Sequence, residues 1–140
     1  MKKLLSLLFS VVLIFSLNSA YAQVEGQTEE NAEISEKSKV EVYYFHGTRR
    51  CETCKAVGKV SKDLVDKKYG SNENVSFIEI DYDEEGHEAL VEKFEVTSSG
   101  LYVYNQKEVV NLTTYAFQYA VTNPQKLESK LKNTINKNLK

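Results

Sequence analysis

Several features that would identify common classes of protein are missing from this sequence. No Gly-x-Gly-x-x-Gly occurs and the chain has only six glycines, so we expect neither a flavin nor a nicotinamide site and predict no cofactor. Only two cysteines and two histidines are present, whereas a structural zinc site needs four ligands at characteristic spacings. We therefore predict no structural metal site.

The chain also lacks a cluster of positive charge. It carries 18 Lys and Arg against 20 Asp and Glu, a formal charge of −2. The first 22 residues hold two of the lysines and no acid, which leaves 16 basic against 20 acidic residues in the remainder, a charge of −4. Phosphate binding requires basic residues gathered on one face. Nucleic acid is therefore not an expected partner.

The amino terminus has the pattern of a secretory signal peptide. Lys2 and Lys3 precede an apolar run from Leu4 to Leu17, and Ala20-Tyr21-Ala22 places small residues at the cleavage positions before Gln23. The apolar run is shorter than the roughly 20 residues that a membrane-spanning helix needs. No cysteine follows the cleavage site to carry a lipid. We expect an exported protein of the periplasm or cell envelope, with no membrane span left after cleavage.

The rest of the chain fits one domain, at residues 40–140, preceded by a linker. Residues 23–39 are acid-rich with almost nothing to bury, which predicts disorder. Hydrophobic periodicity and turn residues predict strands at 40–45 and 75–81, a helix at 51–69, a helix at 84–94 capped by Asp81 or Asp83, a hairpin of 101–104 with 109–112, a short helix within 113–121, and a last helix beginning at Asn123-Pro124. The order is βαβα followed by ββα. It predicts an α/β domain whose central mixed sheet is flanked by helices. We expect this domain to be a monomer.

The two cysteines, Cys51 and Cys54, stand three residues apart at the start of the longest predicted helix. A disulfide closing so small a loop stabilises a fold by only about 2 kcal/mol in the chain-entropy model, so the spacing favours chemistry over scaffolding. The helix macrodipole stabilises a thiolate at Cys51, and Arg49 and Arg50 add positive potential that outweighs the acid Glu52. We expect the pKa of the Cys51 thiol to lie below the usual value of about 8.5. Cys54 lies on the apolar stripe and should be less exposed.

The segment Tyr43-Tyr44-Phe45-His46-Gly47-Thr48-Arg49-Arg50-Cys51-Glu52-Thr53-Cys54-Lys55, together with the βαβα-ββα order, resembles the thioredoxin-like superfamily. The resemblance covers Val40 to about Asn138. Within the superfamily, the same segment is similar to an exported group named nitrophenyl-compound nitroreductase subunits. The resemblance implies a thioredoxin-like fold and thiol–disulfide exchange. A role in a nitroreductase system would be that of a thiol partner passing electrons, because this chain lacks a flavin site.

We expect Cys51 to attack the disulfide of a protein or small molecule, and Cys54 to resolve the mixed disulfide. His46, five residues before Cys51, is a candidate for proton exchange with either thiol, and the alternative is that it only caps the strand at the surface. His87 is expected on a solvated face of the second helix. The predicted substrate groove is lined by Arg50, Glu52, Thr53, Ser98 and Ser99.

Three positions differ from the pattern usual in thioredoxins. Ser99 stands where a cis-proline is usual, and because a non-proline cis bond costs about 2.5–4 kcal/mol, we expect a trans Ser98–Ser99 peptide and a changed groove. Tyr44 replaces a buried carboxylate on the first strand, and a phenol with a pKa of about 10 is a poor base. Arg50 replaces the tryptophan before the first cysteine. Together these changes weigh against ordinary thioredoxin activity.

Other interpretations of the cysteine pair stay open. Two soft thiolates suit copper(I), with His46 as a third ligand. The same fold could also serve as a binding module for a partner protein. A permanently oxidised structural disulfide fits an oxidising compartment, although its weak stabilisation argues against it.

Overall fold

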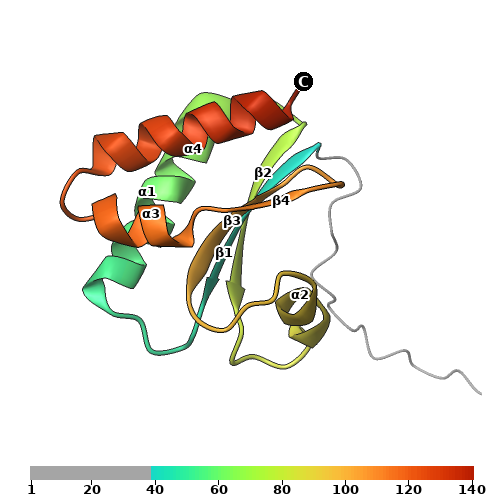
Figure 1. The fold of residues 1–140 in the computed structure, drawn as a ribbon, viewed down its shortest axis with the longest axis vertical. Coiled ribbons are helices and arrows are strands. Elements are labelled where there is room, and N and C mark those ends of the chain that lie inside the picture. The colour runs from blue at the N-terminus through green and yellow to red at the C-terminus, as the bar shows by residue number, and fades with distance from the viewer. Residues whose placement is uncertain (1–38) are drawn as a thin grey trace, which may run out of the picture.

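The computed structural model describes residues 39–140. The predicted signal peptide and nearly all of the predicted linker lie outside the described residues. In chain order the elements are β1 (Val40–His46), α1 (Glu52–Tyr69), β2 (Val75–Asp81), α2 (Glu88–Lys93), β3 (Gly100–Tyr104), β4 (Val109–Asn111), α3 (Thr113–Tyr119) and α4 (Pro124–Asn138) (Figure 1).

The four strands form one mixed sheet in the order β2-β1-β3-β4. β1 pairs in parallel with β2 from Val40↔Val75 to His46↔Asp81, and α1 makes the crossover between them. β3 runs antiparallel to β1 and to β4. The predicted fold class is confirmed: this is an α/β, thioredoxin-like arrangement, and the short helix expected within 113–121 is α3.

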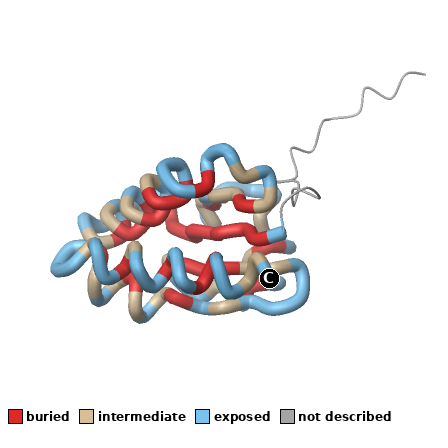
Figure 2. The backbone as a smooth tube through the Cα atoms, turned by 90° about the horizontal axis from the view of Figure 1, so that it is seen from above, coloured by how far each residue is buried: buried red, intermediate tan, exposed pale blue. Residues whose placement is uncertain are grey.

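Both faces of β1 are covered, so all seven of its residues are buried. Val40, Val42 and Tyr44 belong to the larger core cluster, on the face that α1, α3 and α4 cover. Tyr43 and Phe45 belong to a second cluster on the opposite face, beneath the short helix α2. Figures 1 and 2 show the sheet as a buried layer between the helices. The loop that leads to the cysteines therefore begins at the end of a strand that is buried in the core.

α1 begins and ends where the sequence predicts, and α4 begins where it predicts. Cys51 is the N-cap of α1, which ends at Tyr69 just before Gly70. The Asn123 side chain caps α4 by accepting a hydrogen bond from the Lys126 amide at 3.2 Å, and proline follows in the first turn. No helix within residues 39–140 is both long and apolar enough to span a membrane.

The prediction for α2 is wrong at its start and at its cap. The helix begins at Glu88 rather than near residue 84, because Gly86 has a φ of +94° that breaks the helical path. Its N-cap residue is His87, which makes no side-chain capping bond. Asp81 instead accepts from the Asp83 amide at 3.0 Å, and Asp83 accepts from the Thr48 amide at 2.9 Å. These carboxylates organise the loop and not the helix.

Candidate active site

The two cysteines occupy the first turn of α1 and form a disulfide, with Cα atoms 5.1 Å apart. Cys51 has an extended backbone with φ −75° and ψ 166°, and its Sγ accepts a hydrogen bond from the Cys54 amide at 3.2 Å. Cys51 is exposed, whereas Cys54 is only 8% exposed. An entering reactant can therefore reach the first sulfur much more easily than the second.

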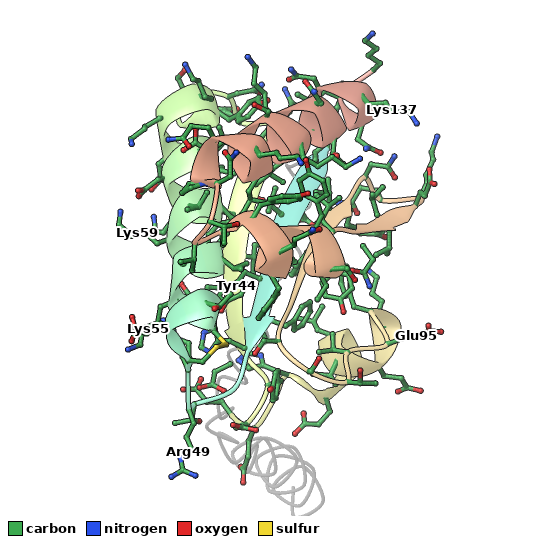
Figure 3. The ribbon with its side chains drawn as sticks, turned by 60° about the vertical axis from the view of Figure 1, so that its left-hand side comes forward. Tyr44, Arg49, Lys55, Lys59, Glu95 and Lys137 are labelled. Carbon is green, nitrogen blue, oxygen red and sulfur yellow. A yellow bond between two sulfur atoms is a disulfide. The ribbon has the colours of Figure 1, made fainter. Side chains whose placement is uncertain are left out.

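Tyr44 lies directly beneath the second cysteine. It is completely buried, and its hydroxyl donates a hydrogen bond to the Cys54 carbonyl at 2.5 Å (Figure 3). Its ring packs against Gly58, where an added Cβ would lie 2.7 Å from Cε1. Burial raises the pKa of Tyr44 to about 12, so the phenol stays protonated and acts as a donor at neutral pH. Tyr44 thus ties the middle strand to the turn that holds both sulfurs.

His46 is buried at the end of β1 and belongs to a charged cluster. It is 9% exposed, and its Nε2 lies 3.2 Å from the Glu79 carboxylate. Its Nδ1 is 3.0 Å from the Gly47 carbonyl. The interpretation of His46 as a surface cap is therefore wrong. Among residues 39–140, no recorded hydrogen bond or ion pair joins His46 to either sulfur, so its part in proton exchange stays a prediction.

Glu79 is the member of this cluster that the sequence analysis missed. It lies on β2 beside Tyr44 in the parallel register, and the same carboxylate oxygen that faces His46 also accepts from the Arg50 guanidinium. The charge of Arg50 is therefore partly offset, which weakens its expected effect on Cys51. Arg49 is exposed and extends away from the fold (Figure 3). The signal that could have identified Glu79 is that it is an acid on the second strand, paired with Tyr44 in the parallel register of β1 and β2.

The loop that joins β1 to Cys51 is held against the segment that follows β2. A Cβ at Gly47 would lie 2.8 Å from the Asp83 carboxylate and 3.1 Å from the Tyr82 hydroxyl, so a larger residue at this position would have to displace these side chains. The Tyr82 amide donates to the His46 carbonyl at 2.9 Å. The two neighbouring strand ends therefore hold the cysteine loop in place.

The other predicted groove residues surround the same end of the sheet. Glu52 is exposed and pairs with Lys55 at 3.0 Å, and Thr53 is half-buried. Ser98 is exposed and Ser99 half-buried just before β3, whose first residue pairs with Phe45 near the end of β1. No cis peptide occurs in residues 39–140, so the Ser98–Ser99 peptide is trans, as predicted.

His87 lies outside this site, and its predicted exposure is wrong. Its side chain is 17% exposed, and its buried Nδ1 has no hydrogen-bond partner among residues 39–140. Within the same described part of the chain, no group of three or more His, Cys, Asp or Glu side chains is arranged to hold a metal ion.

No protein-family model matches this chain, and no curated protein matches it. The crystal structure of mitochondrial thioredoxin 3 from Saccharomyces cerevisiae, in its oxidised form, is similar at 20% identity, with a TM-score of 0.45 over 69% of this chain and 80% of that one. A structure described as a malarial protein is similar at 23% identity, with a TM-score of 0.41 over 58% of this chain and 94% of that one. Neither likeness carries an argument about activity, and neither supports the grouping with nitroreductase subunits. By its own strand order and connections, the chain has a thioredoxin-like fold with a Cys-x-x-Cys disulfide at the start of its first helix.

Proposed function

We propose that this protein is an exported thiol–disulfide oxidoreductase in which Cys51 is the nucleophile and Cys54 the resolving thiol. The observation that carries the proposal is the asymmetry of the pair. An exposed sulfur caps a helix, and a second sulfur, nearly buried, lies at bonding distance one turn inside. Export is proposed from the signal-peptide pattern of the first 22 residues.

Exchange proceeds by two displacements at sulfur. The Cys51 thiolate attacks one sulfur of a partner disulfide, forming a mixed disulfide and releasing the other partner sulfur as a thiolate that takes up a proton. The Cys54 thiolate then attacks the Cys51 sulfur, closing the Cys51–Cys54 bond and releasing the second partner thiol. The partner gains two electrons, and the domain loses two. The same steps in reverse oxidise a partner dithiol.

The helix end and Tyr44 prepare the pair for this reaction. The Cys54 amide donates to Cys51 Sγ, an interaction that strengthens when the sulfur becomes an anion. The Tyr44 hydroxyl fixes the Cys54 carbonyl, so the second sulfur stays aimed at the first. His46 is the proposed proton carrier, acting through solvent at the end of β1.

Trapping of a mixed disulfide tests the proposal. The Cys54→Ser variant should accumulate a covalent adduct with a disulfide substrate such as insulin, because the resolving thiol is missing. The Cys51→Ser variant should form no adduct, since its remaining sulfur is nearly buried. The wild-type protein should also show a two-electron couple in a redox buffer. Equal adduct formation by both variants, or no couple, would refute the assignment.

The same measurements separate the alternative functions. A protein that is silent in the redox buffer but takes up one equivalent of copper(I) on its thiols would be a binding module. An accessory role in a nitroreductase system would require thiol exchange with a separate flavin protein, because this chain shows no sequence pattern for a flavin. Redox silence without copper uptake would leave a partner-protein binding module.

A further inference from the structure

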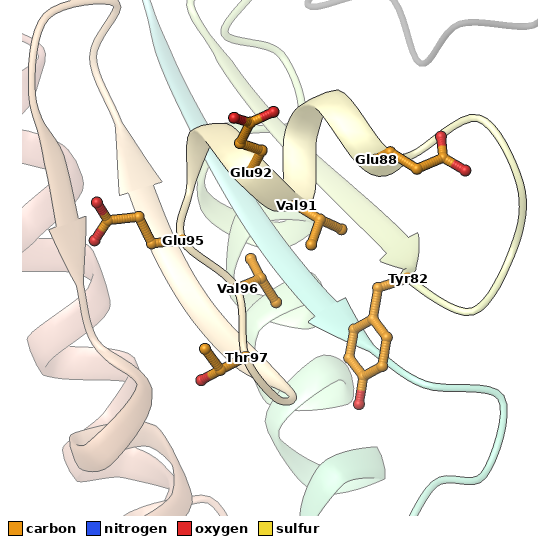
Figure 4. A pocket seen from close by; sticks show the side chains of 7 residues that line it. All are labelled: Tyr82, Glu88, Val91, Glu92, Glu95, Val96 and Thr97. Carbon is orange, nitrogen blue, oxygen red and sulfur yellow. The ribbon is translucent and has the colours of Figure 1, made fainter.

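A hollow of about 430 Å³ lies between α2 and the segment that follows β2. Its floor is formed by Tyr82, Val91, Val96 and Thr97 (Figure 4). The close view shows Val91 and Val96 facing each other across the hollow, with the Tyr82 ring along one side. The Val96 amide donates to the Val91 carbonyl at 2.9 Å, which holds the two valines together. The hollow is therefore preformed and mainly apolar.

The rim of the hollow is acidic. Glu88, Glu92 and Glu95 stand around it with their carboxylates extending outward (Figure 4). From Asp81 to Glu95 the sequence holds seven acids and a single lysine. That lysine, Lys93, has its Nζ 4.1 Å from the centre of the Tyr104 ring, so its charge is engaged with the aromatic cluster. Within residues 39–140, no salt bridge involves these three glutamates, so the rim presents negative charge next to an apolar floor.

The hollow is connected to the cysteine loop by direct contacts. Tyr82 lies on the floor of the hollow. Its backbone amide donates a hydrogen bond to the His46 carbonyl, and its side chain packs against Gly47. The next residue, Asp83, accepts from the Thr48 amide at 2.9 Å. Thr97 leads directly into Ser98 and Ser99, at the same end of the sheet. A chain segment that lies in the hollow and continues past Thr97 would therefore approach the loop that leads to Cys51.

We propose that this hollow is a docking subsite for a basic segment of a partner protein, one that carries apolar and Lys or Arg side chains beside its reactive cysteine. Apolar side chains would fill the floor, and cationic ones would meet the rim carboxylates. The chain's own residues 23–39 are poor occupants, because they hold five glutamates and two lysines. A second copy is disfavoured by the same acidic rim. This inference rests on the proposed exchange reaction and adds its specificity.

The test compares two synthetic peptides, each with one cysteine linked to 2-mercaptoethanol. They share leucine and valine flanks and differ only in carrying three lysines or three glutamates. The reduced protein should react about tenfold faster with the lysine peptide at low salt, a factor that corresponds to about 1.4 kcal/mol. At 0.5 M salt the preference should fall below about threefold, because exposed charges are screened. Glu92→Gln/Glu95→Gln should lower the preference in the same way.

A matched variant, Glu73→Gln/Glu128→Gln, removes two acids far from the hollow and should keep the full preference. Equal rates for the two peptides, or a preference that the matched variant also loses, would overturn the docking proposal. The proposal would also be overturned if the wild-type protein self-associates and Glu92→Gln/Glu95→Gln strengthens that self-association. A second copy of the chain would then be the occupant of the hollow. The uncharged hydroxyethyl disulfide separates the two proposals. A wild-type protein that fails to reduce it fails as an oxidoreductase, whereas one that reduces it but ignores peptide charge fails only at the subsite.

Discussion

Replacing Gly58 by alanine perturbs the contact that places Tyr44 beneath the active-site turn. Gly58 lies in α1 one turn after Cys54 and is buried. A Cβ there would lie 2.7 Å from Cε1 and 3.0 Å from Cδ1 of Tyr44. Carbon atoms in favourable contact are about 3.5–4.0 Å apart, so either the ring or the helix must move. The ring has little freedom, because Tyr44 is 0% exposed and its hydroxyl is bonded to the Cys54 carbonyl.

Two opposing terms set the size of the effect. In an exposed helix interior, alanine is favoured over glycine by about 1 kcal/mol. Overpacking a buried site by a methyl group typically costs about 1–3 kcal/mol. We therefore expect Gly58→Ala to lower the unfolding free energy by about 1 kcal/mol. The same change at an unhindered helix position would raise it by a similar amount. For a domain of roughly 100 residues this lowers Tm by about 4–8 °C.

Thermal unfolding of the oxidised protein measures this loss. The control is the same change in a Tyr44→Leu background, where a smaller, flexible side chain relieves the contact. There Gly58→Ala should be neutral or stabilising. The reduction potential of Gly58→Ala should also shift, since the displaced phenol no longer holds the Cys54 carbonyl. A single variant that melts several degrees higher than wild type, with an unchanged potential, would refute the packing argument.

Three further predictions concern buried or paired ionisable groups. Burial raises the pKa of Tyr44 to about 12. The stabilisation by the protonated phenol is therefore complete below pH 10 and is lost toward pH 12 at about 1.4 kcal/mol per pH unit. Urea unfolding across this range should show that Tyr44→Phe loses less unfolding free energy per pH unit than the wild type. Burial also raises the pKa of Glu41, whose neutral form stabilises the fold fully below pH 4.5 and progressively less above it. The unfolding free energy of Glu41→Gln should therefore exceed that of the wild type by about 1–3 kcal/mol at pH 8. Thermal unfolding at pH 4 should show no such gain. Glu79→Gln removes the anion paired with Arg50 and so stabilises a thiolate at Cys51. The reduction potential of the Cys51–Cys54 pair in this variant should therefore rise by roughly 30 mV or less, where 30 mV is about 1.4 kcal/mol. A lower potential than that of the wild type would contradict the role of the cluster.

Local sequence signals were sufficient for most elements. β2 runs from Val75 to Asp81 as predicted, because its apolar run is bounded by a polar turn and an acid. α1 carries a strong apolar stripe between Cys51 and Gly70, and α4 has a matching Asn123 cap. The cysteine pair needed no tertiary information, since its spacing and its place at a helix start follow from the chain alone.

The features that sequence reasoning missed depend on contacts between distant segments. Glu79 lies 28 positions beyond Cys51, and only the parallel register brings it to His46 and Arg50. The same pairing buries His46, which its neighbours in sequence do not indicate. The prediction for the start of α2 was wrong for a different reason. The acids before this helix could cap it, but one of them, Asp83, instead accepts a hydrogen bond from the Thr48 amide. Gly86 then delays the helix to Glu88.

The placement of the chain's described ends has a practical consequence for attachment. β1 starts at Val40, paired with the first residue of β2, whereas the cysteines follow its far end. The last turn of α4 lies near the tip of the β3–β4 hairpin, where the Asn105 amide donates to Asn138 at 2.7 Å (Figure 1). A strand of seven residues spans about 23 Å. The active-site cysteines would therefore face away from any support joined upstream of Val40 or downstream of Asn138. Such a support could be a fluorescent protein, a bead or a membrane linker.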